Sequence, residues 1–429
     1  MKAEDSQYLL IPFQCGYNFE EHLMETRGLR RAEMAEMIAL QCLVFRADGH
    51  ERYRRYILED SSYDWEQTRV GVEDGRIVST LRIWDRVLQV GSCGVRMGGV
   101  GGVATHPDFR GAGRGSALVS DATAYMQRSG YHIAALFSEI PCRFYRRLGW
   151  ASLPRAFFRL EMGRVTPSEQ HEWQVEPFIE QRDLEAVVKL YDNYNVTQSG
   201  ALVRHRPYWE MAPSRIRGLL PTVVALSGGR CGGYLNYEIA GENARVLEVT
   251  SERGQPAVLA ALVDQFLQVC ARRGVREISG EIPHRHPLVE QLAIVTDGDL
   301  YLGGDLTMML YAVDLAGLLG RVLPELQERL DAGIAPFAPV AFRFALNEQQ
   351  CVLQLSAAGK LTVVDSVANA LTLDMPASFF WRLLLGESSW KGLAPTLQTC
   401  GLLVPDAAVA VLEALFPQRE VIFWGPDHF

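Results

Sequence analysis

The sequence lacks long apolar runs and an excess of positive charge. No stretch of its 429 residues approaches the roughly 20 apolar residues of a membrane helix, and residues 1–6 are too polar for a signal peptide. We therefore expect a soluble, cytoplasmic protein with no membrane partner. The formal net charge is −9, whereas binding a nucleic-acid backbone requires a basic face. We expect no nucleic-acid partner.

The sequence also lacks the cysteine patterns of metal and redox sites. Its eight cysteines are spread along the chain, with no C-x-x-C pair and no Cys/His cluster at zinc-ligand spacing. His284 and His286 have no third ligand at a suitable spacing. We therefore expect no metal, cysteines that are reduced core residues, and a solvated loop around the two histidines.

The length predicts about three domains. Residues 1–165 show helices, antiparallel strands, a glycine-rich strand, a helix, a strand, a short helix and a strand, which favours an α+β fold over a doubly wound sheet. Residues 166–318 repeat this order, but residues 250–255 contain a single glycine. Residues 319–429 alternate short strands and helices, and the apolar segment 421–429 predicts a final strand tied down at the chain end.

A glycine-rich loop between a strand and a helix is the clearest chemical signal. Its residues are Arg110, Gly111, Ala112, Gly113, Arg114, Gly115 and Ser116. The first N–H groups of the following helix would point at a pyrophosphate, and Arg110 or Arg114 could add a charge-assisted contact. A P-loop would need Gly-Lys-Ser/Thr, and a Rossmann loop would need a parallel βαβ unit. The R-x-x-G-x-G spacing matches neither and is typical of an acetyl-CoA loop.

About 30 residues later, the segment from Arg143 to Trp150 predicts a short helix that ends at Gly149. Tyr145 in this helix is a candidate general acid, because a phenol of pKa about 10 keeps its proton at neutral pH. Cys142 could suggest an acyl-cysteine intermediate, but it has no activating histidine nearby in the sequence. We therefore expect direct transfer without a covalent enzyme intermediate.

With these motifs, the whole chain resembles the Eis (enhanced intracellular survival) family of N-acetyltransferases in the GNAT superfamily. The resemblance implies a GNAT domain, a degenerate GNAT-like domain that binds acetyl-CoA poorly, and a C-terminal domain like sterol carrier proteins. It also implies a homohexamer, with acetyl-CoA as co-substrate and a cationic primary amine, such as an aminoglycoside or a lysine side chain, as acceptor. By this resemblance, acetyl-CoA contacts three segments. They are Val103, Ala104 and Thr105 in the strand before the loop, the glycine-rich loop from Arg110 to Ser116, and Ser138 and Glu139 before Tyr145.

The resemblance further implies that the terminal carboxylate, here that of Phe429, acts as the general base. A carboxylate with a pKa of roughly 3.5 is a weak base unless burial raises that value or its main task is to hold the amine. A backbone N–H of a bulge near Val103 would polarise the thioester carbonyl. Asp427 and His428, beside the terminus, are candidates to face the acceptor. Trp65 and Trp84 are candidates for its pocket, with packing in the core or at the rim as the alternative.

One alternative function remains at this point. The protein could be a scaffold or a lipid or small-molecule binding protein whose GNAT domain is vestigial. The intact loop and tyrosine of the first copy, beside the eroded second copy, favour the enzyme.

Overall fold

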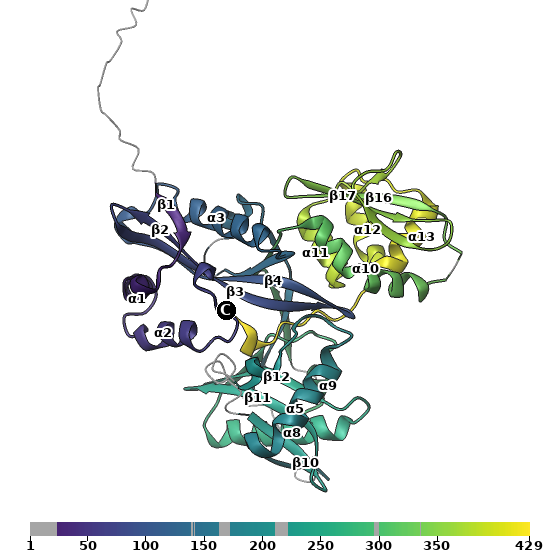
Figure 1. Ribbon diagram of the computed structural model, residues 1–429. Coiled ribbons are helices and arrows are strands. Elements are labelled where there is room, and N and C mark those ends of the chain that lie inside the picture. Colours follow the sequence, from purple (N-terminus) through teal and green to yellow (C-terminus); the bar gives the residue numbers. More distant parts are fainter. Residues whose placement is uncertain are drawn as a thin grey trace, which may run out of the picture.

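The computed structural model describes residues 24–138, 140, 142–162, 172–210, 222–295, 300–334 and 336–429. Within these residues the strands form three sheets, and each sheet is the centre of one part of the molecule (Figure 1). The mixture of largely antiparallel sheets and helices confirms the predicted α+β class. None of the described helices combines the length and hydropathy of a membrane span.

The first sheet has the order β1-β2-β3-β4-β5-β15-β6, and β9 pairs with β3 outside this path. Its strands are β1 (Glu25–Gly28), β2 (Thr68–Glu73), β3 (Arg76–Val90), β4 (Cys93–Thr105), β5 (Ile133–Phe137), β6 (Ala151–Ser152), β9 (Ser199–Leu202) and β15 (Met308–Ala312). Asp74 and Gly75 join β2 to β3 with φ of 48° and 75°. This is the hairpin turn that the Asp-Gly pair favours.

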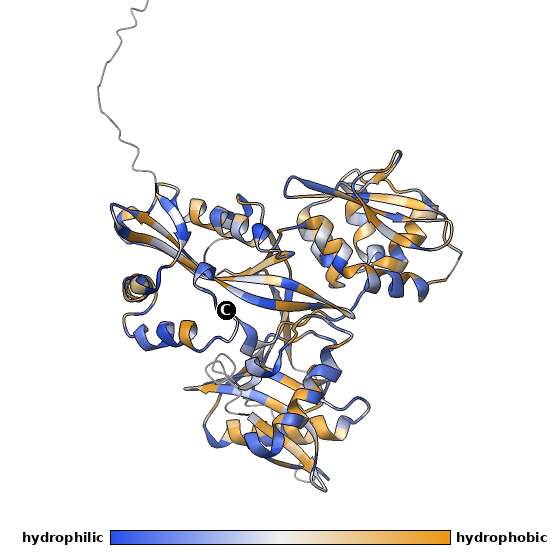
Figure 2. Cartoon of the chain, viewed as in Figure 1, coloured by the Kyte–Doolittle hydropathy of each residue, from blue (hydrophilic) through white to orange (hydrophobic). Residues whose placement is uncertain are grey.

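Helices cover this sheet on both sides. They are α1 (Met34–Val44), α2 (His50–Leu58), α3 (Arg114–Arg128) and α4 (Arg143–Arg146), with the 3-10 helices η1 (Arg31–Glu33), η2 (Trp65–Gln67) and η3 (Pro107–Phe109). The buried residues of α3, including Leu118, Ala122 and Met126, recur at helical spacing and pack against Ile83 and Val100. In Figure 2, α2 is mostly hydrophilic, with an apolar stretch near its end. Its buried residue, Ile57, packs in the core beside α1.

The second sheet repeats the order of the first. Its strands are β7 (Arg155–Glu161), β8 (Gln174–Pro177), β10 (Thr222–Ser227), β11 (Arg230–Ala240), β12 (Asn243–Ser251), β13 (Glu277–Gly280) and β14 (Tyr301–Asp305), and its helices are α5 (Glu180–Asn195), α6 (Arg206–Glu210), α8 (Pro256–Arg272) and α9 (Pro287–Val295). The run β10-β11-β12-α8-β13 corresponds to β2-β3-β4-α3-β5, and β12 pairs with β13 in parallel, as β4 does with β5.

The two sheets exchange a strand at equivalent places. In the first, β15 lies between β5 and β6, and in the second, β7 lies between β13 and β14. The expected domain 1–165 contains β7, which joins the second sheet. The expected domain 166–318 contains β15, which joins the first sheet. These ranges therefore do not describe the sheets correctly. The error has a physical reason: a strand's sequence pattern shows which faces are buried but not which strand is its partner.

The third part contains a four-stranded sheet, β18-β17-β16-β19. Its elements are α10 (Leu315–Asp331), β16 (Val340–Leu346), β17 (Gln349–Leu355), β18 (Leu361–Val364), β19 (Leu371–Thr372), α11 (Ala377–Leu385), α12 (Trp390–Thr399) and α13 (Asp406–Leu415). Leu318 and Val322 of α10 share one core with Leu88 and Val95 of the first sheet. The third part therefore packs on the sheet face opposite α3.

The C-terminal segment leaves the third part and ends beside β3 and β4 (Figure 1). Val421 forms a single parallel bridge with Ser199, and the segment then forms the 3-10 helix η5 (Gly425–Asp427). The predicted final strand is therefore wrong. The segment is ordered instead by its side chains, because Trp424 is buried in the second core and Phe423 in the core shared by the first and third parts.

Candidate active site

The candidate site lies where β4 and β5 separate. Their parallel pairing covers Met97–Gly99 and Ile133–Ala135, although β4 continues to Thr105 and β5 to Phe137. On its other edge β4 carries an extra residue, since Thr80 pairs with Ala104 but Arg82 pairs with Gly101. Gly102 has φ of 61° in this bulge. The bulge predicted near Val103 is therefore present, and it bends β4 away from β5.

The predicted phosphate loop connects this end of β4 to α3. Gly111 and Gly113 have φ of 83° and 78°, a conformation that favours glycine, and a Cβ on either would meet no atom within 4 Å. Gly113 is the N-cap of α3, and no side chain of the described residues caps the helix there. The N–H groups of Arg114, Gly115 and Ser116 are therefore a donor set suited to a pyrophosphate.

The side chains of the two loop arginines, Arg110 and Arg114, form hydrogen bonds within the protein. Arg114 Nε and Nη2 donate to the Glu73 carboxylate at 2.6 and 2.8 Å. Arg110 is exposed, and its Nε donates to the backbone oxygen of Thr105 at 3.1 Å. The prediction of a phosphate contact from the Arg114 guanidinium therefore does not fit this geometry, whereas Arg110 keeps its terminal nitrogens at the exposed surface.

The other predicted acetyl-CoA contacts lie around the same separation of strands. Val103 and Thr105 are half-buried and Ala104 is buried. A Cβ on Gly115 would lie 3.5 Å from Thr105 Oγ1 and 3.6 Å from the Phe144 ring. The structure thus brings the end of β4, the loop and α4 together.

The segment after β5 is only partly described. The N–H of Ser138 donates to the Thr307 oxygen at 2.8 Å, and its Oγ donates to the Ile140 oxygen at 2.7 Å. Both donors of Ser138 are therefore occupied within the protein. Glu139 lies outside the described residues.

Tyr145 lies in α4, beside this site. Its side chain is buried with Trp150 and Leu136 against α3. Burial raises the pKa of Tyr145 to about 12, so the phenol keeps its proton over the whole working range of an enzyme. Gly149 has φ of 86°, and the N–H of Trp150 donates to the Tyr145 oxygen at 3.2 Å. The helix is short and is followed by a left-handed glycine, as predicted.

The chain end lies on the opposite face of β4 from α3. A Cβ on Gly101 would lie 3.0 Å from the carboxyl carbon of Phe429 and 3.3 Å from Trp84 Nε1, and a Cβ on Gly99 would lie 2.6 Å from the Phe429 ring. The ring centroids of Phe429 and Phe137 are 5.4 Å apart. The glycines of β4 therefore give the last residue a place beside the backbone.

Two residues that the sequence placed at exposed positions or left as candidates for them, Asp427 and His286, are buried. Asp427 is buried against Arg204 and Tyr208 rather than facing an acceptor. His286 is also buried, not solvated, and burial lowers its pKa to about 3. Sequence patterns could not indicate either placement, because the covering residues come from distant segments.

His428 packs against residues of the first and second parts. The His428 ring stacks on Phe137 with centroids 4.2 Å apart, and its Nε2 is 3.0 Å from an Arg155 nitrogen.

The seven described cysteines are free, but Cys400 is exposed and is not a core residue. Among the described residues, no three His, Cys, Asp or Glu side chains are grouped as metal ligands.

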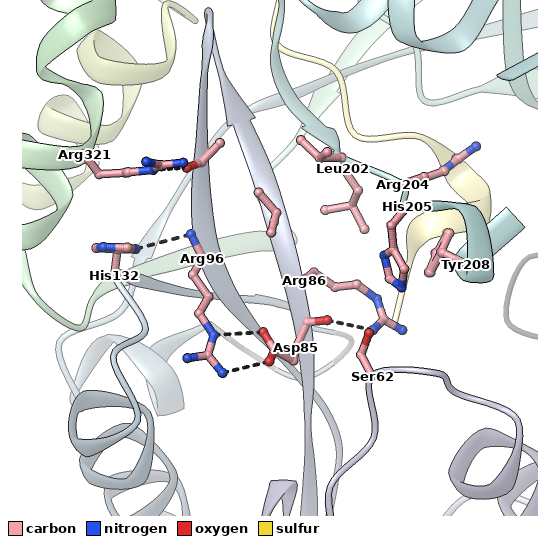
Figure 3. Close-up of a pocket in the computed structure, with 13 residues that line it drawn as sticks. Ser62, Asp85, Arg86, Arg96, His132, Leu202, Arg204, His205, Tyr208 and Arg321 are labelled. Carbon is pink, nitrogen blue, oxygen red and sulfur yellow. Dashed lines mark hydrogen bonds and ion pairs between the residues drawn. The ribbon is translucent and has the colours of Figure 1, made fainter. Parts of the chain in front are cut away.

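Two cavities lie outside this site. The larger, of about 590 Å³, lies beside β3 and β4 and is lined by residues that include Asp85, Arg96 and His132 on one side and Arg204, His205 and Tyr208 on the other (Figure 3). The second, of about 510 Å³, lies between α4 and α11. Neither is lined by a predicted site residue.

Comparisons with known proteins agree with this architecture. Residues 25–153 match the model of the acetyltransferase (GNAT) domain. No curated protein matches the sequence.

Solved structures resemble almost the whole chain. A probable N-acyltransferase from Enterococcus faecalis has 18% identity and a TM-score of 0.73 over 95% of this chain and 100% of its own. A GCN5-related N-acetyltransferase from Anabaena variabilis has 16% identity and a TM-score of 0.70 over 95% and 100%. Eis1 from Mycobacterium abscessus has 17% identity and a TM-score of 0.65 over 94% and 99%. Together with the family model, these likenesses identify residues 25–153 as a GNAT acetyltransferase domain.

Proposed function

We propose that the protein is an N-acetyltransferase that moves an acetyl group from acetyl-CoA to a primary amine by direct attack. The observation that carries the proposal is the position of the Phe429 carboxyl group beside Gly101, at the bulge of β4. A phosphate-binding donor set at the start of α3 and a protonated phenol at Tyr145 lie around the same part of the sheet.

Acetyl-CoA would supply the acetyl group as a thioester. The N–H groups of Arg114, Gly115 and Ser116 would bind its phosphates, and the β4 backbone from Val103 to Thr105 would hold the chain that leads to the sulfur. The residues present fit this ligand, because the loop is open and its backbone donors point outward from the helix.

The protein's own groups would then handle the protons. The Phe429 carboxylate would take a proton from the substrate ammonium, directly or through water, so that the nitrogen lone pair attacks the acetyl carbon. A backbone N–H at the bulge would stabilise the developing oxyanion. As the carbon–sulfur bond breaks, Tyr145 would give its proton to the sulfur. The nitrogen would lose its second proton through water, which restores the Tyr145 phenol, and the proton on the Phe429 carboxyl group would pass to solvent. No covalent enzyme intermediate is required.

The finer parts of the proposal rest on the family resemblance. We propose membership of the Eis family, a third part related to sterol carrier proteins, and a cytoplasmic homohexamer. Two features support membership of the family. The first two sheets repeat one order of elements, and the chain end runs from the third part to the first sheet. The acceptor is proposed to be cationic, with aminoglycosides and lysine side chains as the first candidates.

The test is release of CoA from acetyl-CoA with a panel of amines, together with the melting temperature. Acetyl-CoA at 100 times its dissociation constant should stabilise the protein by about 2.7 kcal/mol. An upward shift with CoA release supports the enzyme. A shift without release for any amine would indicate a binding protein, and no shift would favour a scaffold with a vestigial domain.

A further inference from the structure

Asp427, two residues before the chain end, is held by buried groups of the second part. Arg204 donates to its carboxylate from Nε at 2.9 Å and from Nη2 at 2.8 Å, and the Tyr208 hydroxyl donates to it at 2.9 Å. The Asp427 and Arg204 side chains are 0% and 1% exposed. Charge-assisted hydrogen bonds in such a dry environment are directional and strong.

Asp427 is not needed to neutralise Arg204. The carboxylate of Glu248 already pairs with the Arg204 guanidinium through Nη1, at 3.0 Å, and Nη2. With Asp427 added, two buried carboxylates share one guanidinium, and burial raises the pKa of Glu248.

A second group of charged side chains lies next to it, around β3. Arg82 and Arg86 both pair with the carboxylate of Asp60. The Arg86 guanidinium lies 5.0 Å from the Tyr208 ring, and Arg86, Arg204 and Tyr208 line the same cavity (Figure 3). The carboxylate of Asp427 therefore lies beside charged residues of both the first and the second parts.

Only His428 separates Asp427 from Phe429, so a fixed Asp427 keeps the terminal carboxyl group within about 7 Å of it. The N–H of Asp427 also donates to the Trp424 oxygen at 3.0 Å. We propose that Asp427 is a positioning residue, which through Arg204 and Tyr208 holds the Phe429 carboxylate at the β4 bulge. This rests on the proposed role of that carboxylate in acetyl transfer.

Two substitutions test the proposal in folded protein. Asp427→Asn keeps a side-chain oxygen and leaves the Arg204–Glu248 pair neutral, so the fold should persist while the hold on the chain end weakens. Tyr208→Phe removes one donated hydrogen bond and keeps the ring beside Arg86. We expect Asp427→Asn to lower kcat by about 10- to 100-fold, because misplacement by about 1 Å can cost about 100-fold. Tyr208→Phe should cost less, and the Kd for acetyl-CoA should be unchanged in both.

A double-mutant cycle separates a positioning role from a merely structural one, because only a positioning role couples Asp427 to the place of the terminal carboxylate. Each substitution is repeated in a chain extended by one glycine after Phe429, which displaces the carboxylate. In that background Asp427→Asn should change the residual rate less than about twofold. The matched control is Glu325→Gln, which removes another buried carboxylate, paired with Arg329 and Arg419. It should lower the melting temperature and leave kcat unchanged.

A wild-type kcat in Asp427→Asn would overturn the proposal, and so would an equal loss of rate in both backgrounds. If the added glycine itself leaves kcat at the wild-type value, the proposed function of the carboxylate is wrong and the positioning role falls with it. The extension alone identifies that second failure, so the two are distinguishable.

Discussion

The carboxyl group of Phe429 lies directly against Gly101 of β4, so closely that a Cβ at residue 101 would be 3.0 Å from its carbon. The two residues are far apart in the sequence, yet they meet where the first sheet opens.

Extension of the chain tests this relationship most directly. Adding two or more residues after Phe429 should move the negative charge from the bulge and lower kcat by at least about tenfold, and deleting Phe429 should do the same. The measurement is CoA release in protein with unchanged melting behaviour. A tagged protein at the wild-type rate would exclude the terminal carboxylate as base and direct attention to His428.

Gly99→Ala should displace the last residue from the other side. The added methyl group would lie 2.6 Å from the Phe429 ring, so the ring must move and the carboxylate with it. We expect kcat to fall by about tenfold with no change in the Kd for acetyl-CoA. Gly320→Ala is the control, since a Cβ there meets nothing within 4 Å. Equal kcat values for Gly99→Ala and Gly320→Ala would contradict a role of the Phe429 position in the reaction.

Gly113→Asp should block the loop while the fold persists. Aspartate at an N-cap can bond the free N–H groups itself, and its charge would repel a pyrophosphate. Calorimetry should detect no acetyl-CoA binding. Gly254→Asp, in the corresponding loop before α8, is matched for backbone strain because φ is 76° there and 78° at Gly113. It should bind acetyl-CoA normally, and normal binding by Gly113→Asp would remove the loop from the site.

Tyr145→Phe should lower kcat and kcat/KM by the same factor, about 10- to 100-fold, because the lost proton matters mainly in the transition state. The Kd for acetyl-CoA should not change. Since burial raises the pKa of Tyr145 to about 12, the wild-type rate should show no alkaline loss from this group below about pH 11. An unchanged kcat in Tyr145→Phe would mean that the side chain only packs.

His286 gives a pH dependence of stability. Burial lowers its pKa to about 3, so below about pH 6.5 the unfolded chain takes up a proton that the folded protein refuses. Stability from this group is therefore present above pH 6.5 and lost as pH falls towards 3. His286→Asn should reduce the slope of unfolding free energy between pH 4 and 6 by up to about 1.4 kcal/mol per pH unit. Urea unfolding measures it, and an unchanged slope would contradict a buried neutral His286.

Local patterns predicted many elements well. The apolar spacing in α3 and the Asp74–Gly75 pair specify a helix and a hairpin through short-range sterics and burial. The loop from Arg110 to Ser116 was found for the same reason, because its positive φ values and free N–H groups are local properties. The third part alternates short strands and helices as expected, for example β16 (Val340–Leu346) and α11 (Ala377–Leu385).

The sequence by itself determined the loop, the repeated order of elements and the residue types of the site. Only the tertiary structure decided that β7 and β15 exchange sheets, that Arg114 pairs with Glu73, and that Asp427 turns to Arg204. These outcomes depend on which distant segments meet, and a strand or a charged side chain carries no local mark of its partner. The position of Phe429 beside Gly101 is set in the same way, by the packing of three sheets and by glycines that leave room for the chain end.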